Sequence, residues 1–161
     1  MAFFWWSDTE SSYRDMESID AECGKCQGIQ KHTLRYYIQK SKSYSVLTTS
    51  TKRSIIAVCH GCLQEKPLDP KYEEEKVNQF ECQILTWEAH QQLEKGNYRK
   101  ALKKLDKALK KDPENPQTLF AKASTLIDFG QKEEAQPILS KLLEQFPDSE
   151  DVIALKEKIG I

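Results

Sequence analysis

The sequence lacks a long apolar run. The one apolar run near its start is residues 2–6, Ala-Phe-Phe-Trp-Trp, which is too short to span a bilayer as a helix. No basic region precedes it and polar Ser7 and Asp8 follow at once, so it is not typical of a secretory signal. We therefore expect a cytoplasmic protein with no membrane partner. The aromatic residues Phe3, Phe4, Trp5 and Trp6 favour an extra packed strand, although an exposed cluster would mark a partner site.

The sequence also lacks the patterns that most enzyme classes need. It has no nucleophile with its base at a plausible spacing, no glycine-rich phosphate loop and no carboxylate pair in a recognisable context. Its cysteine pairs do not lie in a thioredoxin-like βαβ setting. We expect a protein that is not an enzyme.

One block of the chain lacks acidic residues. Residues 23–64 contain seven Lys or Arg and no Asp or Glu, whereas residues 1–22 contain six acids and one Arg. The net charge of -1 for the 161-residue chain hides this segregation. The acidic stretch from Asp8 to Glu22 lies beside the basic block in sequence, so it can fold over the basic face.

Four of the five cysteines fall within the basic block, as two Cys-x-x-Cys pairs. The pairs are Cys23 with Cys26 and Cys59 with Cys62. A two-residue spacer lets a tight turn aim both thiolates at one tetrahedral ion, and two such pairs complete a closed sulfur shell. The spacing predicts a structural Zn²⁺ site with no open position for a substrate.

Glycines and histidines accompany the cysteine pairs. Gly28 follows the first pair and Gly61 lies within the second, and we expect them to supply the unusual backbone angles of such turns. His32 and His60 could each replace a thiolate. Because four cysteines already suffice, we expect both histidines to be surface residues.

The 32 residues between the cysteine pairs are typical of strands. Leu34, Tyr36 and Ile38 alternate on one face. The expected strands are residues 32–38, 44–49 and 55–58, separated by polar turns at 39–43 and 50–54. Two cysteine turns that bracket a small antiparallel sheet resemble the zinc-ribbon family over about residues 20–64. The resemblance implies a metal-stabilised module of about three strands.

The basic block also suggests a second use for this module. Lysines and arginines interleaved with tyrosines can contact phosphates and stack on bases. The candidate nucleic-acid-binding residues are Lys25, Lys31, Arg35, Tyr36, Tyr37, Lys40, Lys42, Lys52 and Arg53. Nucleic acid is therefore the alternative partner to a protein.

The second half of the chain is predicted to be helical. Residues 65–70 contain two prolines and are typical of a linker, and a helix is expected from about Lys71 to Lys95, with first turns that pack on the ribbon or act as a spacer. A 34-residue repeat follows. It relates Gly96 to Gly130, Ala101 to Ala135, Leu105 to Leu139, Leu109 to Leu143 and Pro113 to Pro147. This period resembles the tetratricopeptide repeat (TPR) family over about residues 82–149.

Local signals give the helix boundaries of the repeats. Asn115 before Pro116 predicts a capped helix start, and Ser149 offers a cap for a closing helix that ends near Ile159. Pro137 lies just past the first turn of its helix, where it can introduce a kink. Cys82 is a lone thiol at a helical position and is expected to be buried.

The TPR resemblance implies a peptide-binding groove lined by the inner helices. The matching positions in this sequence are Gln83, Thr86, Trp87, His90, Gln117, Phe120, Ser124 and Asp128. Trp87 and Phe120 are the expected anchors because aromatic residues dominate binding hot spots. The long helix or the ribbon could instead fill the groove. The Lys, Asn and Arg clamp by which some members of the family hold a terminal carboxylate is absent, which disfavours such partners.

The predicted fold class is α+β: a small antiparallel zinc-ribbon sheet, then an all-α array of TPR-like hairpins with a C-terminal capping helix. The predicted domains are residues 1–64, with an aromatic N-terminal strand, and residues 71–161, joined by a linker at 65–70. The function that we expect is non-enzymatic binding of an unidentified protein or peptide.

Overall fold

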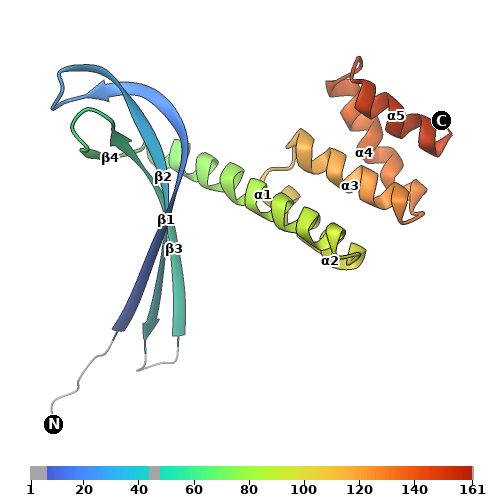
Figure 1. Cartoon of the computed structure of the whole chain (residues 1–161), viewed down its shortest axis with the longest axis horizontal. Helices are drawn as coiled ribbons and strands as arrows, with labels where there is room; N and C mark the ends of the chain where they lie inside the picture. The colour runs from blue at the N-terminus through green and yellow to red at the C-terminus, as the bar shows by residue number, and fades with distance from the viewer. Residues whose placement is uncertain (1–6, 44–47, 161) are drawn as a thin grey trace, which may run out of the picture. The chain divides into compact units, whose positions relative to one another are not determined.

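A four-stranded antiparallel sheet forms the first part of the protein in a computed structural model, which describes residues 7–43 and 48–160 (Figure 1). Its strands lie in the order β1-β2-β3-β4. They are β1 (Ser7–Cys23), β2 (Gly28–Ser43), β3 (Thr48–Cys59) and β4 (Glu65–Pro67). The aromatic cluster at residues 3–6 lies outside the described residues, so its expected packing stays a prediction.

The strands are longer than the sequence pattern predicts. β2 continues through residues 39–43 and β3 continues through residues 50–54, so the turns expected at both places are wrong. The two polar stretches pair with each other, and the hydroxyl groups of Ser41 and Ser50 lie 2.7 Å apart across the ladder. Threonine and serine occur in solvent-facing strands as well as in turns, and here the pairing between β2 and β3 favours the strand.

The acidic stretch forms β1, a strand that the sequence did not predict. It pairs with β2 so that acids lie opposite bases, as in Glu10 opposite Lys40 and Asp20 opposite Lys31. Opposite charges in directly facing positions stabilise an antiparallel pair. The acidic residues therefore join the basic strand edge to edge and do not fold over its face.

One face of the sheet is buried. Side chains alternate along a strand, and Leu34, Tyr36 and Ile55 are nearly or fully inaccessible to solvent. The start of α1 (Pro70–Glu94) packs on the sheet, since Glu73 accepts a hydrogen bond from the Ile55 N–H at 3.0 Å and Lys76 forms an ion pair with Glu17. The first turns of this helix thus stabilise the sheet. This agrees with the expectation that they pack on the first module and not with a role as a spacer.

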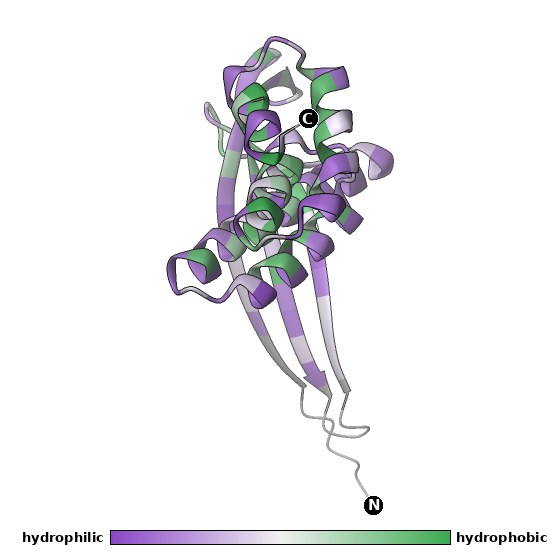
Figure 2. Cartoon of the chain, turned by 90° about the vertical axis from the view of Figure 1, so that its right-hand side faces the viewer, coloured by the Kyte–Doolittle hydropathy of each residue, from purple (hydrophilic) through white to green (hydrophobic). Residues whose placement is uncertain are grey.

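Five helices follow the sheet in the described chain, and polar and apolar residues both occur along the helices (Figure 2). After α1 they are α2 (Tyr98–Lys111), α3 (Pro116–Asp128), α4 (Lys132–Gln145) and α5 (Glu150–Ile159). The two repeat glycines, Gly96 and Gly130, have φ values of 69° and 81° and end α1 and α3 with the same backbone hydrogen bonds. The 34-residue repeat therefore reproduces one helix-ending turn.

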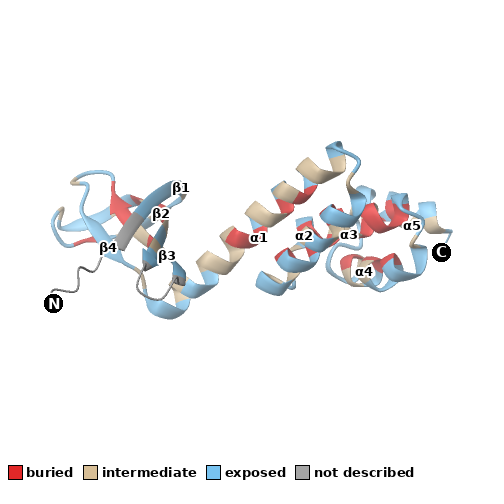
Figure 3. Cartoon of the chain, turned by 90° about the horizontal axis from the view of Figure 1, so that it is seen from below, coloured by how far each residue is buried: buried red, intermediate tan, exposed pale blue. Residues whose placement is uncertain are grey.

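Buried residues concentrate on α3, which contacts α2, α4 and α5 (Figure 3). Small residues at Ala89, Ala101 and Ala121 surround Leu105 in one cluster. A second cluster joins α3, α4 and α5 through Leu119, Ala123, Leu126, Ala135, Leu139, Leu142, Val152 and Leu155. α5 covers the second repeat as expected for a closing helix.

The local helix signals have different outcomes. Asn115 caps α3 by accepting a hydrogen bond from the Thr118 N–H at 3.0 Å, which confirms the predicted cap. Ser149 occupies the start of α5 but makes no side-chain capping bond. α4 continues through Pro137, and Cys82 is fully buried as expected.

The chain divides into two compact units, residues 1–77 and 78–161. We refer to them as the sheet unit and the helical unit. The division falls inside α1, and β4 occupies part of the stretch from 65 to 70 in which the sequence predicts a linker. Among the described residues no helix is both long and apolar enough to cross a bilayer.

Candidate functional site

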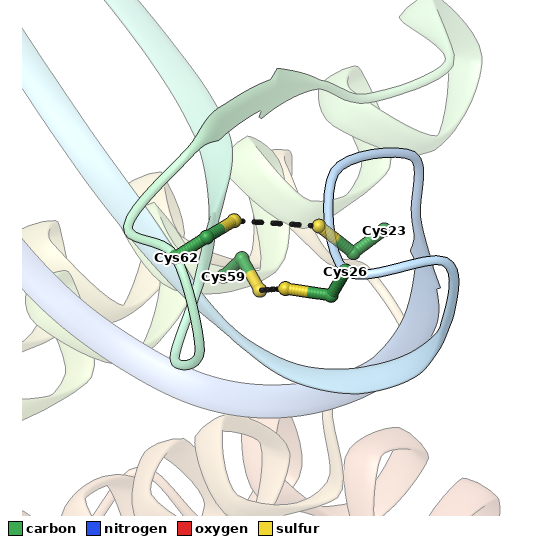
Figure 4. Close-up of side chains that lie close together, drawn as sticks. All are labelled: Cys23, Cys26, Cys59 and Cys62. Carbon is green, nitrogen blue, oxygen red and sulfur yellow. Dashed lines mark hydrogen bonds between the residues drawn. The ribbon is translucent and has the colours of Figure 1, made fainter.

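Four cysteine thiols converge at one end of the sheet (Figure 4). Cys23 and Cys26 come from the turn between β1 and β2, and Cys59 and Cys62 from the turn between β3 and β4. All four Sγ atoms lie within 4.8 Å of one another. The Sγ atoms of Cys23 and Cys62 are 3.5 Å apart and those of Cys26 and Cys59 are 3.9 Å apart. All four cysteines are free thiols, and both sulfur separations exceed the about 2.0 Å of a disulfide bond.

The sulfur spacing fits a tetrahedral metal ion. Four sulfurs at about 2.3 Å from such an ion are about 3.8 Å from one another, and the two measured distances bracket that value. In the described part of the chain, these cysteines are the one cluster of metal-ligating side chains that could hold an ion. The geometry can accept a metal ion, and the donor set of four thiolates suits Zn²⁺.

The two cysteine turns have the same backbone hydrogen bond and the same backbone conformation at their last residue. The Gln27 N–H donates to the Cys23 carbonyl, and the Leu63 N–H donates to the Cys59 carbonyl, both at 2.9 Å. Gln27 and Leu63 have φ values of 55° and 58°, so each turn ends in a left-handed residue. Each pair of thiols is therefore held on the same hydrogen-bonded turn.

The expectation that glycines supply these angles is wrong, because neither Gly28 nor Gly61 has a positive φ. Gly61 serves a different need. A Cβ atom at this position would lie 3.3 Å from the Cys26 sulfur and 3.9 Å from the Cys59 sulfur. The missing side chain therefore leaves room for the sulfurs to approach.

The thiols influence one another electrostatically. Backbone hydrogen bonding from Cys26, with a contribution from the Cys62 thiol, lowers the pKa of Cys23 to about 6. The neighbouring Cys62 and Cys23 thiols raise the pKa of Cys26 to about 12. A first thiolate thus forms readily and opposes a second one nearby. A bound cation would remove this repulsion, which is why such a cluster favours a metal.

The two histidines beside the cysteines differ in burial. His32 is only 1% exposed, and its Nδ1 lies 2.9 Å from the Gln30 carbonyl oxygen. Its expected surface position is wrong, because strand alternation puts it on the buried face with Leu34. His60 is exposed as expected, with Nε2 2.7 Å from the Thr33 hydroxyl.

The candidate nucleic-acid-binding residues are not all accessible to a ligand. Tyr36 is 1% exposed and cannot stack on a base, which corrects its expected role. Arg35 lies 4.4 Å from the Tyr13 ring centre and forms an ion pair with Asp15 at 2.6 Å. Tyr37 is half-buried and donates to Glu65. The exposed members are Lys25, Lys31, Lys40, Lys42, Lys52 and Arg53.

A groove of about 580 Å³ lies within the helical unit. Its lining includes six of the eight residues predicted for a peptide groove, namely Gln83, Thr86, Trp87, His90, Gln117 and Phe120. Ser124 and Asp128 are not among the lining residues. The sequence pattern missed Phe146 and Asp151, which line the groove from the end of α4 and the start of α5. Within this unit, α1 forms one wall of the groove and does not fill it.

Two large aromatic side chains of the lining are exposed. Trp87 is 59% exposed and Phe146 is 42% exposed. The Thr86 side chain, by contrast, is buried and used inside the protein, with its hydroxyl 2.7 Å from that of Thr118 and donating to the Cys82 carbonyl at 2.9 Å. Thr86 therefore joins α1 to α3, while the rings remain available for contact.

Residues 92–159 match the model of the tetratricopeptide repeat family. The matched segment begins near the end of α1 and extends through α2, α3, α4 and α5. It starts ten residues later than the register inferred from the repeats and includes the closing helix. The match supports a TPR module in the helical unit and a role in protein–protein interaction.

Proposed function

We propose that this protein is a non-enzymatic adaptor in which a zinc-stabilised ribbon accompanies a TPR groove that binds a peptide segment of another protein. One observation carries the proposal: an open groove of about 580 Å³ on a TPR module, with exposed aromatic rings in its lining. Pockets of about 300–1,000 Å³ with mainly apolar lining and a few polar groups are typical binding sites.

The charges and side chains that line the groove indicate which kind of peptide it can bind. Its lining residues include no Lys or Arg, and Asp151 is the one carboxylate among them. A terminal carboxylate or an acidic peptide would find no counter-charge there. An internal segment that inserts an aromatic or aliphatic side chain between Trp87 and Phe146 suits the lining better. A Lys or Arg in that segment would gain from Asp151.

A peptide-display library selected against the full chain tests this groove. We expect selected peptides to bind Trp87→Ala at least about tenfold more weakly, since truncating a hot-spot anchor costs about 2 kcal/mol or more. Trp87 is largely exposed, so its replacement should leave the fold intact. Phe129→Ala is the matched control because Phe129 is 44% exposed and does not line the groove. Equal binding by both variants would reject the groove.

The ribbon is proposed to hold Zn²⁺ through Cys23, Cys26, Cys59 and Cys62 for structural purposes. A complete four-thiolate shell has no open coordination position, so it supports the fold and not catalysis. The alternative function, nucleic-acid binding, rests on the exposed bases Lys40, Lys42, Lys52 and Arg53 at the far end of the β2–β3 pair. It requires salt-dependent binding of labelled RNA or DNA to the full chain, which Lys40→Glu should weaken.

A further inference from the structure

The outer edge of β3 is covered along only part of its length. β4 pairs with Ile56, Ala57 and Val58, whereas β2 pairs with β3 from Thr48 to Cys59. Within the described residues, no strand pairs with residues 49–54 on the side away from β2. We call residues 49–54 the open edge.

The alternation of hydrogen bonds along β3 shows which backbone N–H and C=O groups point outward from the open edge. In an antiparallel pair, alternate residues direct their backbone groups to the same side. The Cys59 N–H donates towards β4 at 3.0 Å, and the Ile55 N–H donates to the Glu73 carboxylate on that same side at 3.0 Å. The register with β2 is continuous through this part of β3. Thr49 and Thr51 therefore direct their backbone N–H and C=O groups outward.

Glu73 shows that a carboxylate can accept a hydrogen bond from the outer edge of β3. Its carboxylate oxygen bonds the backbone N–H of Ile55, the first outward-facing residue beyond the end of β4. A side chain from α1 thus takes the place of a strand carbonyl at that point. The open edge continues from this contact and presents the same outward donors.

The open edge also has a defined charge. Its side chains carry hydroxyl groups and two bases, Lys52 and Arg53, and no acid. The matching segment of β2, residues 37–42, also carries two bases, Lys40 and Lys42, and no acid, and it pairs with the acidic strand β1, placing Glu10 opposite Lys40. An acidic strand beside β3 would lie next to Lys and Arg side chains, as β1 does beside β2. Exposed edges are sites at which another chain can add a strand.

We propose that the open edge binds an acidic extended segment of another protein as an added strand. Backbone carbonyl groups of the segment accept hydrogen bonds from the Thr49 and Thr51 N–H groups, and its carboxylates lie beside Lys52. The site is independent of the groove in the helical unit.

The test uses the full chain loaded with zinc and a fluorescent peptide of alternating Glu and Val, about seven residues long as in a typical strand. The matched probe replaces Glu with Lys. We expect the acidic peptide to bind with salt-dependent affinity and the basic one not to bind. Lys52→Glu should weaken binding about tenfold or more, since it replaces an attraction with a repulsion. Lys107→Glu, the same charge change on the exposed side of α2, should not affect binding.

Thr51→Pro separates strand addition from simple charge attraction. Its N–H faces outward, so proline removes no hydrogen bond between β2 and β3 but blocks an added strand. We expect this variant to lose binding while keeping its metal content. On the wild type, the peptide should slow hydrogen exchange of the Thr49 and Thr51 amides and leave Ser50, which faces β2, unchanged.

Three results would overturn the proposal. The first is binding of the basic peptide as strongly as the acidic one. The second is unchanged exchange at Thr49 and Thr51 in the presence of saturating acidic peptide. The third is absent peptide binding together with self-association that Thr51→Pro abolishes, because the occupant of the edge would then be a second copy of this chain.

Discussion

The sheet unit and the helical unit achieve order by different means. The sheet buries a few large side chains on one face and leaves its far end polar, and it ends in four thiols gathered within 4.8 Å. The helical unit packs alanines and leucines from α1, α2, α3, α4 and α5 into two apolar clusters, and in its described residues none belongs to the candidate metal ligands. Small domains whose core is insufficient commonly rely on a metal. The difference suggests that one unit folds with its ligand and the other folds by packing alone.

Removing the metal should have the largest effect and should separate the two units. Structural zinc supplies about 10–16 kcal/mol of apparent binding free energy in small zinc modules. We expect Cys59→Ser, or a strong chelator, to unfold the sheet while α2 to α5 keep their helical structure. Metal analysis and residue-resolved hydrogen exchange measure both effects.

Cys82→Ala is the control for this experiment. Cys82 is a buried cysteine outside the thiol cluster, and its sulfur contacts the Thr118 hydroxyl at 3.3 Å. The variant should have the same metal content as the wild type. Protection of the β2 and β3 amides that survives metal removal would contradict the proposed dependence of the sheet on its ligand.

Truncating a packed leucine should give the converse result. Leu105 is fully buried between Ala89, Ala101 and Ala121, and such a leucine-to-alanine change costs about 2–5 kcal/mol. We expect Leu105→Ala to lower the thermal transition of the helical unit, measured by far-UV circular dichroism. Lys107→Ala on the exposed side of the same helix is the control. Loss of bound metal in Leu105→Ala would show that the units are coupled.

A smaller effect distinguishes the two helix starts. The Asn115 Oδ1 accepts hydrogen bonds from the backbone N–H and the hydroxyl of Thr118 at 3.0 and 2.9 Å. Losing such a cap costs about 1 kcal/mol, so Asn115→Ala should destabilise the helical unit by that amount. Ser149→Ala is the matched control, since Ser149 makes no capping bond. Equal changes in chemical denaturation midpoint would contradict the assignment.

Sequence periodicity predicted the helical unit well because its structure is local and repeated. Gly96 and Gly130 recur at the repeat distance, and each takes the left-handed conformation that ends a helix. The missed groove residues Phe146 and Asp151 follow from how α4 and α5 pack on α3, which no local pattern encodes.

The sheet was harder to predict, because whether a segment forms a strand depends on the strand with which it pairs. β1 is rich in Asp and Glu, which have low strand propensity, and its pairing depends on bases such as Lys31 and Lys40 in another strand. The Cys-x-x-Cys spacing, by contrast, is local, and it predicted the convergence of all four thiols. The left-handed Gln27 and Leu63 carry no sequence signal, since other residue types usually hold such positions.

The smallest expected effect is the pH dependence of an ion pair in the helical unit. The Lys141 ammonium, 2.6 Å from Glu114, lowers the pKa of that carboxyl below its usual value, with help from a hydrogen bond from Gln145. A lowered folded-state pKa means that the ionised carboxylate favours the folded state. Its contribution is present above the ordinary value of 4.5 and is lost as the pH falls through the lower folded-state value. Because the pair is exposed, we expect a small change.

Glu114→Gln should therefore reduce the stability of the helical unit slightly at neutral pH and have no effect once the wild-type carboxyl is protonated. Denaturation midpoints of both proteins across the acid range measure the difference. The helical unit holds none of the candidate metal ligands, so acid release of a metal from the thiols does not directly change its signal. A difference between the proteins that grows as the pH falls would contradict the direction of the Glu114 shift.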